Sequence, residues 1–175
     1  SKITGAHVRS DQDIVHEAIR TYLDVLDSNN LPEKREVAFY GGSFTGLTVE
    51  RQSNLFDAVI PWIKTGHIDS IRVSTHSLLV DDINISFLKD NFVQVVELGI
   101  QSTNNDVLSA VGRPCGFATV KGAVKSIRKK ELTLGLQLMP GLPKDDESTF
   151  LQSVKDVISL RPDFVRIYPT LVIRN

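Results

Sequence analysis

The chain has 175 residues, 41% of them hydrophobic and 23% charged, and a formal net charge of −1 at pH 7. This size and composition predict a single globular domain, residues 1–175, and exclude disordered, collagen-like and coiled-coil classes. The near-zero charge gives no electrostatic reason for nucleic acid or an anionic membrane to be an obligatory partner. The one cysteine, Cys115, excludes an internal disulfide framework and favours a reducing cytoplasm, and no apolar run is long enough to cross a membrane.

Predicted helices and strands alternate along the chain. Ile14, Ala18, Leu23 and Leu26 are spaced to form the inward face of a first helix, with Ser10 or Asp11 as its N-cap. The following elements are, in chain order, a strand at 37–40, a helix at 49–64, a strand at 70–74, a short helix at 82–89, a strand at 93–98, a short helix at 105–111, a helix at 118–130, a strand at 134–139, a helix at 146–160 and a strand at 164–168.

The five predicted strands are continuously apolar rather than alternating, which is typical of parallel strands covered on both faces. Strands that alternate with helices in this way form an α/β fold with right-handed crossovers. The pattern therefore predicts either an open doubly wound sheet or a (β/α) barrel. Both architectures bind ligands at the carboxyl ends of their strands.

Small and polar residues follow every predicted strand. Glycine punctuates many strands, but five such ends together predict a cofactor-sized cleft. The first turn lacks the signatures of P-loops and Rossmann folds, and its exposed backbone suits a carboxylate or an ammonium group. The strand-end groups are Gly41-Gly42-Ser43, Ser74-Thr75-His76, Glu97 with Gln101-Ser102, Gln137 with Met139 and Gly141, and Ile167-Tyr168-Pro169.

Four blocks resemble the radical S-adenosylmethionine (SAM) superfamily, in the branch of the Elongator catalytic subunit and oxygen-independent coproporphyrinogen oxidase-like proteins. The blocks are, in order, VAFYGGSFTGL, VELGIQS, LGLQLMPGLP and PDFVRIYPTLVI. The resemblance implies an α/β fold, a partial (β/α)6 TIM-like barrel whose first strand is missing from this chain. It also implies two cofactors, SAM and a [4Fe-4S] cluster held by a CxxxCxxC motif, and cleavage of SAM to a 5′-deoxyadenosyl radical that abstracts hydrogen from a substrate.

The resemblance also implies where SAM would lie. Gly41, Gly42 and Ser43 match the motif that receives the methionine amino group, and Ser74 and Thr75 match positions near the methionine carboxylate or ribose. Glu97, Gln101 and Ser102 match groups that reach polar atoms of SAM. The positions implied beside the ribose and adenine are Gln137, Met139, Gly141, Ile167, Tyr168 and Pro169. Implied partners are tRNA or a small metabolite as substrate and a reductant such as ferredoxin or flavodoxin.

The cluster motif is missing from the chain. Cys115 cannot supply three thiolates, so no metal ligands are expected here, and the cluster cysteines are expected just before Ser1, where Lys2-Ile3-Thr4-Gly5 resembles the run that follows them. The chain as given is therefore expected to be an incomplete core without a conventional cluster. The family's Ser-Thr-Arg-Pro-Asp and Arg-Gly-His-Thr are also changed, to Ser-Thr-His-Ser-Leu from Ser74 and to Arg-Pro-Cys-Gly from Arg113.

Several residues keep two interpretations. Glu97 on a buried strand fits a binding site or a structural salt bridge with Arg166 or Arg72. His76 fits a ligand contact or an ordinary surface position, and Cys115 fits a reactive thiol or an inert small side chain. The basic residues of the predicted helix at 118–130 fit RNA contact or a solvated face.

Three functions follow from these patterns. The first is the core of a radical SAM enzyme, and the second is a cluster-free module that binds SAM or a nucleotide. The third is an unrelated (β/α) lyase or isomerase that shares only the fold. An aldolase would need a lysine at a strand end, and none of the five strand ends provides one.

Overall fold

A computed structural model describes residues 10–26 and 32–171. The chain divides into two compact units, of which the first comprises Ser1–Val37 and Leu47–Ser70 and the second Ala38–Gly46 and Ile71–Asn175. The run Lys2-Ile3-Thr4-Gly5 and the last two residues of the PDFVRIYPTLVI block lie outside the described residues. No helix in the described ranges has the length and apolar character needed to cross a membrane.

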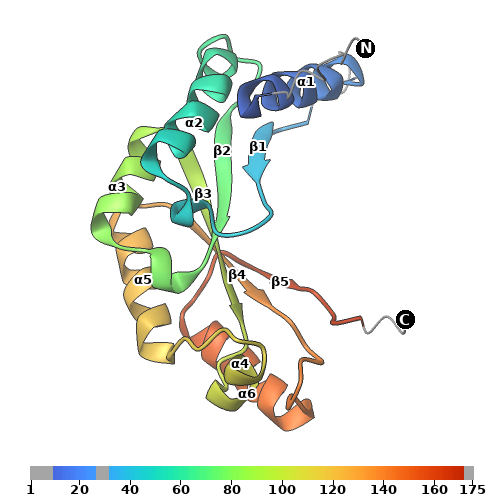
Figure 1. Cartoon of the computed structure of the whole chain (residues 1–175), viewed down its shortest axis with the longest axis vertical. Coiled ribbons are helices and arrows are strands. Elements are labelled where there is room, and N and C mark those ends of the chain that lie inside the picture. Colours follow the sequence, from blue (N-terminus) through green and yellow to red (C-terminus); the bar gives the residue numbers. More distant parts are fainter. Residues whose placement is uncertain (1–9, 27–31, 172–175) are drawn as a thin grey trace, which may run out of the picture. The chain divides into compact units, whose positions relative to one another are not determined.

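The first unit contains two helices that pack against each other, α1 (Asp11–Asp24) and α2 (Val49–Lys64) (Figure 1). Ser10 is the N-cap of α1, as one of the two predicted positions. Its hydroxyl accepts a hydrogen bond from the backbone N–H of Asp13, whose carboxylate accepts one from the backbone N–H of Ser10. This reciprocal capping satisfies two backbone donors at the start of the helix.

The predicted inward face of α1 is wrong at its first two positions, Ile14 and Ala18, whereas Leu23 and Leu26 are half-buried. Val15 and Ile19 are the buried residues of α1, whereas Ile14 is 52% exposed and Ala18 is also exposed. Val15 and Ile19 form their own i, i+4 stripe, one position further along the helix than the predicted pair. They are β-branched residues with more apolar surface than Ala18, so this stripe buries more apolar area.

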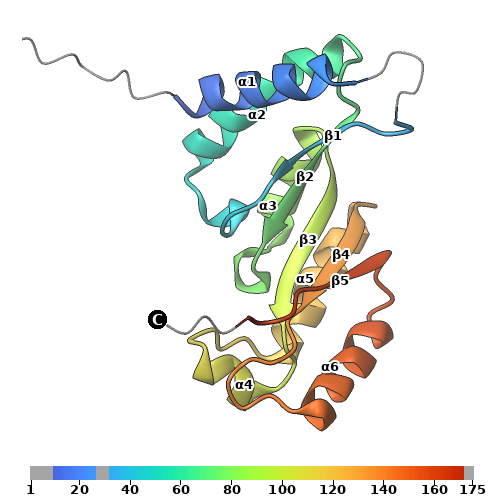
Figure 2. The same cartoon turned by 90° about the vertical axis from the view of Figure 1, so that its right-hand side faces the viewer.

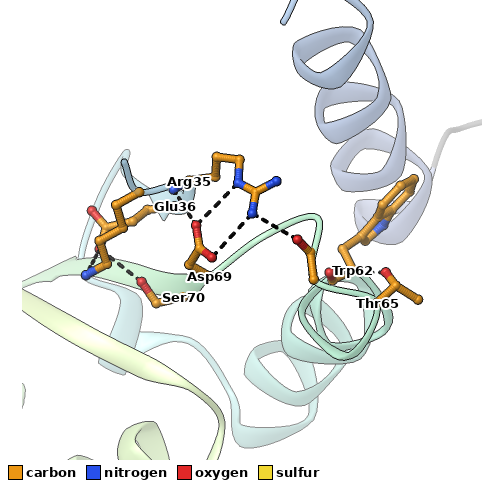
Figure 3. Close-up of polar contacts among 8 residues, drawn as sticks. Arg35, Glu36, Trp62, Thr65, Asp69 and Ser70 are labelled. Carbon is orange, nitrogen blue, oxygen red and sulfur yellow. Dashed lines mark hydrogen bonds and ion pairs between the residues drawn. The ribbon is translucent and has the colours of Figure 1, made fainter. Parts of the chain in front are cut away.

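A second contact in the first unit joins the residue before β1 to the loop that precedes β2. The Asp69 carboxylate accepts a hydrogen bond from the backbone N–H of Arg35 at 2.7 Å, and the Arg35 guanidinium faces the same carboxylate (Figure 3). The guanidinium also donates to the carbonyl of Gly66. Hydrogen bonds from Arg35 hold the pKa of Asp69 below its ordinary value.

The second unit contains most of the sheet and the remaining helices. The strands, of which β1 and β2 begin in the first unit, are β1 (Glu36–Phe39), β2 (Ser70–Thr75), β3 (Val93–Gln101), β4 (Thr133–Leu138) and β5 (Phe164–Ile167). The helices are α3 (Asp82–Asp90), α4 (Asn105–Ala110), α5 (Phe117–Lys129) and α6 (Glu147–Ser159). Every strand and helix predicted from the sequence is present, with ends that differ by at most three residues.

The five strands form one sheet in the order β1-β2-β3-β4-β5, and the ladders from β2 to β5 are parallel (Figure 2). A doubly wound sheet reverses its strand order at a switch point, whereas a (β/α) barrel adds its strands in chain order. The sequential order confirms the barrel-like alternative. The sheet formed by the described residues is not closed.

The two faces of the sheet differ in character. Leu134, Leu136 and Leu138 of β4 are buried, and α3 and α5 pack against each other and against β3 and β4 (Figure 1). Successive side chains of a strand point to opposite faces, so Gly135 and Gln137 lie on the other face. That polar face carries the candidate site.

Gly135 makes room for two larger side chains on this face. A Cβ at position 135 would lie 2.6 Å from Cε2 of Phe164 on β5 and 2.9 Å from Cγ of Glu97 on β3. Real Cβ contacts are not this short, so any side chain here would displace the phenyl ring or the carboxylate.

We expect Gly135→Ala to lower the free energy of unfolding by about 1–3 kcal/mol because of this overpacking. Denaturant titration of the variant measures the change. Gly122→Ala in α5 is the matched control, because a Cβ there meets nothing within 4 Å and alanine in a helix is favoured over glycine by up to about 1 kcal/mol. Equal stability of Gly135→Ala and the wild type would contradict this packing.

Candidate functional site at the carboxyl ends of the strands

The loop after β1 depends on its glycines. Gly41 and Gly42 have φ angles of 100° and 123°, in the region that L-residues rarely adopt. Phe44 anchors the loop, because its ring is buried and stacks on Phe39 with the ring centroids 5.3 Å apart. The loop is therefore held by an apolar anchor while its glycine backbone stays accessible.

Two further contacts fix the other end of this loop. The hydroxyls of Thr45 and Thr75 are 2.5 Å apart, which ties the loop to the end of β2. A Cβ on Gly46 would lie 3.0 Å from Cδ1 of Leu79, so a side chain at this position would require Leu79 to shift slightly. The φ angles of Gly41 and Gly42 require glycine, whereas Gly46 allows a close approach of Leu79.

A cavity of about 370 Å³ opens where these strand ends meet. We call it the strand-end cavity, and it lies wholly within the second unit. Eight of its lining residues are among the predicted site residues: Gly41, Gly42, Ser43, Ser74, Thr75, Gln101, Gln137 and Tyr168. Three were not predicted: Tyr40, Gly99 and Arg113.

The other six predicted residues do not line the cavity. Glu97 lies buried in the sheet, and Ser102 is buried with its hydroxyl 3.2 Å from that of Ser153. Met139 donates its backbone N–H to the carbonyl of Gln101, so it continues the β4 edge of the site. The backbone N–H of Gly141 donates to Asp145, and Ile167 and Pro169 are exposed.

Three polar side chains converge above Gly99. A Cβ at this position would lie 3.0 Å from Nε2 of Gln101 and 3.7 Å from both Nη2 of Arg113 and Oε1 of Gln137. Because Gly99 has no side chain, these three polar groups can line one end of the cavity. Arg113 follows α4 instead of a strand, so the search of strand ends missed it. Its match to the arginine of the family's Arg-Gly-His-Thr run was the available signal.

Two atoms at this end are buried without a hydrogen-bond partner among the described residues, Oε1 of Gln101 and Nε of Arg113. No ion pair in the described part of the chain involves Arg113. Buried polar groups in native proteins are normally satisfied, so these two atoms indicate a missing polar ligand. The arginine suits a carboxylate or phosphate, and the amide oxygen suits a hydroxyl or ammonium donor.

Glu97 lies directly below the cavity and is fully buried. Oε1 accepts hydrogen bonds from the Tyr40 hydroxyl at 2.6 Å and from Nη1 of Arg72 at 2.9 Å, and Oε2 accepts one from Nε2 of Gln137 at 2.7 Å. Nε of Arg166 is 3.1 Å from Oε2, an ion-pair distance without hydrogen-bond alignment. Glu97 therefore forms ion pairs with both Arg72 and Arg166, the two arginines named for its structural interpretation.

The protonation state of Glu97 follows from these contacts. Burial acts to raise the pKa of Glu97, but the hydrogen bonds from Tyr40, Gln137 and Arg72 and the charge of Arg166 outweigh it and lower the pKa. The side chain is thus a carboxylate that only accepts hydrogen bonds. Burial and the hydrogen bond to this carboxylate raise the pKa of Tyr40 to about 12.

His76 and Cys115 both have structural roles in the described chain. Nδ1 of His76 accepts a hydrogen bond from the backbone N–H of Leu78, which caps the short turn Ser77–Leu79. Burial and the charge of Arg113 lower the pKa of His76. Burial raises the pKa of Cys115, against the influence of Arg113, which favours the inert interpretation of this thiol.

The basic helix α5 is partly neutralised. Arg128 pairs with Asp163 at 2.8 Å and Lys129 pairs with Asp82 at 2.7 Å. Exposed pairs of this kind contribute little to stability, but they reduce the positive field of the helix. This favours the solvated-face interpretation over RNA contact for α5.

The iron–sulfur cluster does not fit the residues of this chain. A [4Fe-4S] cluster needs several cysteine thiolates, and the sequence has one cysteine, which is buried. Within the described ranges, His, Cys, Asp and Glu form no group able to hold a metal ion.

Comparison with known proteins identifies the family. The model of the radical SAM superfamily matches residues 6–157, and the chain belongs to this superfamily of enzymes. The chain is 29% identical to the anaerobic coproporphyrinogen III oxidase 1 of Cereibacter sphaeroides over 129 residues, which are 73% of this chain and 28% of that protein. It is 32% identical to the tRNA uridine(34) acetyltransferase of Methanocaldococcus jannaschii over 83 residues, 46% of this chain and 15% of that protein.

A solved structure gives the same fold. Elp3 of Methanocaldococcus infernus superposes with a TM-score of 0.76 at 22% identity, over 94% of this chain and 43% of that structure. The resemblance stated from the sequence is confirmed. The chain spans less than a third of the length of the coproporphyrinogen III oxidase and of the tRNA uridine(34) acetyltransferase.

We expect Tyr40 to give an alkaline titration step near pH 12, followed by absorbance of the phenolate. Its pKa is raised from 10.0 to about 12, so its neutral form stabilises the fold fully below pH 10.0. That contribution is lost as the pH rises from 10.0 to about 12. Tyr40→Phe removes the step near pH 12, with Tyr22→Phe as control. A step near pH 12 that survives in Tyr40→Phe would contradict the contact with Glu97.

Proposed function

We propose that this chain is the SAM-binding core of a radical SAM enzyme and that SAM occupies the strand-end cavity. The observation that carries the proposal is the polar end of the cavity, where the side chains of Arg113 and Gln101 converge above Gly99 and each has one buried polar atom without a partner among the described residues. A zwitterionic amino-acid group joined to a hydroxylated sugar satisfies both atoms. Membership of the superfamily supports SAM as that ligand.

The proposal assigns the lining residues to parts of SAM. Arg113 pairs with the methionine carboxylate, and the accessible backbone of Gly41, Gly42 and Ser43 receives the amino group. Gln101 and Gln137 accept from the amino group or the ribose hydroxyls, and the Tyr168 ring offers apolar contact to the adenine. Ser74 and Thr75, at the end of β2, line the cavity on that side. The six predicted residues outside the lining would support the strand ends or contact SAM through their backbone.

Bound SAM would supply the radical chemistry: one electron from an external reductant would break its S–C5′ bond, which would release methionine and leave a 5′-deoxyadenosyl radical for hydrogen abstraction. The residues of this chain bind and orient SAM, and the closed polar end above Gly99 holds the methionine moiety in one position. Because the cavity lacks cluster ligands, we assign the [4Fe-4S] cluster to cysteines outside these 175 residues. A reductant such as ferredoxin or flavodoxin and a cytoplasmic location complete the proposal.

The substrate is either tRNA or a small metabolite. Similarity to a tRNA uridine(34) acetyltransferase and to Elp3 supports tRNA. Similarity to a coproporphyrinogen III oxidase over a longer part of the chain supports a small metabolite with a tetrapyrrole framework. The pairing of Arg128 and Lys129 on α5 reduces the positive charge of one candidate tRNA surface.

We expect Arg113→Met to weaken binding of S-adenosylhomocysteine by about 10- to 100-fold, the loss expected for one charged hydrogen-bonding group. Calorimetry on the full-length protein measures the dissociation constant. Arg20→Met on α1 removes the same charge outside the cavity and is expected to bind with unchanged affinity. If Arg113→Met bound as tightly as Arg20→Met, the carboxylate assignment would be wrong.

Activity is tested with the full-length protein after anaerobic iron–sulfur reconstitution. We expect a brown protein that releases 5′-deoxyadenosine from SAM after reduction with dithionite, detected by chromatography. Faster release with tRNA than with coproporphyrinogen III would support the tRNA assignment, and the reverse would support the metabolite. A colourless protein that binds SAM without cleaving it would refute the radical reaction and support a cluster-free binding module.

A further inference from the structure

The orientation of the Gln137 amide is fixed from below the cavity. Nε2 of Gln137 donates to Oε2 of Glu97 at 2.7 Å, and Gln137 is itself 8% exposed. Glu97 is a carboxylate and offers no proton in return, so the opposite orientation would set the amide oxygen against a carboxylate oxygen. The amide nitrogen therefore points into the sheet and Oε1 points toward the space above Gly99.

The carboxylate is held too firmly to turn away from Gln137. Tyr40 and Arg72 occupy its other oxygen, Oε1, and Arg166 lies 3.1 Å from Oε2. Gly135 on β4 leaves the space that the Glu97 side chain fills, since a Cβ there would lie 2.9 Å from its Cγ. The buried network thus presents one defined face of Gln137 to the cavity.

This face is a hydrogen-bond acceptor, and it lies beside the amide of Gln101. A Cβ on Gly99 would lie 3.7 Å from Oε1 of Gln137 and 3.0 Å from Nε2 of Gln101, whose own Oε1 has no partner in the described structure. An acceptor without a protein partner at this place requires a donor from the ligand. Of the parts of SAM, the ribose hydroxyls and the ammonium group can donate.

We propose that Glu97 is a positioning residue, which acts through Gln137 to present a hydrogen-bond acceptor to the cavity and so makes the site select a ligand with a ribose hydroxyl. This inference rests on the proposed function. It differs from direct contact between Glu97 and SAM, because the carboxylate is fully buried and its oxygens are occupied by protein groups.

The test compares S-adenosylhomocysteine with its 2′-deoxy and 3′-deoxy analogues by calorimetry on the full-length protein. In the wild type, we expect loss of one of the two hydroxyls to weaken binding about tenfold, which is one hydrogen bond to a fixed acceptor. Glu97→Gln lets the Gln137 amide adopt both orientations, so the discrimination is expected to fall to about twofold or less.

Two further variants separate positioning from a general loss of structure. In Glu97→Gln with Gln137→Glu, the new glutamine donates to the new carboxylate, whose second oxygen faces the cavity, so the discrimination is expected to return. Arg72→Met loosens the carboxylate on Oε1 without touching the bond to Gln137, so it is expected to lower stability and keep the discrimination. Unchanged discrimination in Glu97→Gln would overturn the inference, as would a double variant that fails to restore it.

A readout without ligand distinguishes failure of this inference from failure of the proposed function. With selective ¹⁵N-glutamine labelling, the side-chain amide of Gln137 is expected to give a proton resonance shifted by its hydrogen bond to a carboxylate, and Glu97→Gln is expected to remove the shift. A shifted resonance in a protein that binds no SAM analogue would refute the proposed function and leave the positioning intact. A Gln137 resonance that is the same in the wild type and Glu97→Gln would refute the positioning.

Discussion

The carboxylate of Glu97 is the feature on which the rest of the site depends. An isolated charge is costly to bury, and removal of one partner from a buried pair costs about 3–5 kcal/mol. Here the partners come from the other four strands or the residue that follows one: Arg72 from β2, Gln137 from β4, Arg166 from β5 and Tyr40 from the residue after β1. One buried side chain is thereby in contact with groups from all parts of the sheet.

The positions around this carboxylate show why small residues are needed beside it. Gly135 admits the Glu97 side chain and the Phe164 ring, and that ring lies under the guanidinium of Arg72 at 5.3 Å and of Arg166 at 5.8 Å. Two residues further along the paired strands β3 and β4, Gly99 leaves open the space above which Gln101, Gln137 and Arg113 meet. On the same face of the sheet, side chains therefore fill the space beside Gly135, whereas the strand-end cavity lies beside Gly99.

The fold was largely predictable because its signals are local. Apolar runs and helix caps located every strand and helix, and the barrel alternative needed only the sequential strand order. The inward face of α1 was not predicted correctly, because two overlapping i, i+4 stripes were available and only packing against α2 selects Val15 and Ile19.

The sequence predicted the part of the site that lies at strand ends, and it did not predict the rest. Eight of the residues expected at strand ends line the cavity, since parallel strands bring their carboxyl ends together. Arg113 lies on a loop after α4, and its approach to Gly99 depends on tertiary structure. The sequence left Glu97 with two interpretations, a ligand contact or a salt bridge, and its position on β3, two residues before Gly99, gives it partners from the sheet itself.

A crystal structure of the full-length protein with S-adenosylhomocysteine tests the central claim most directly. The account predicts density for the ligand in the strand-end cavity, with its carboxylate at Arg113 and a ribose hydroxyl donating to Oε1 of Gln137. Density for a saturating ligand at any other place, or a Gln137 amide turned away from Glu97, would contradict the account.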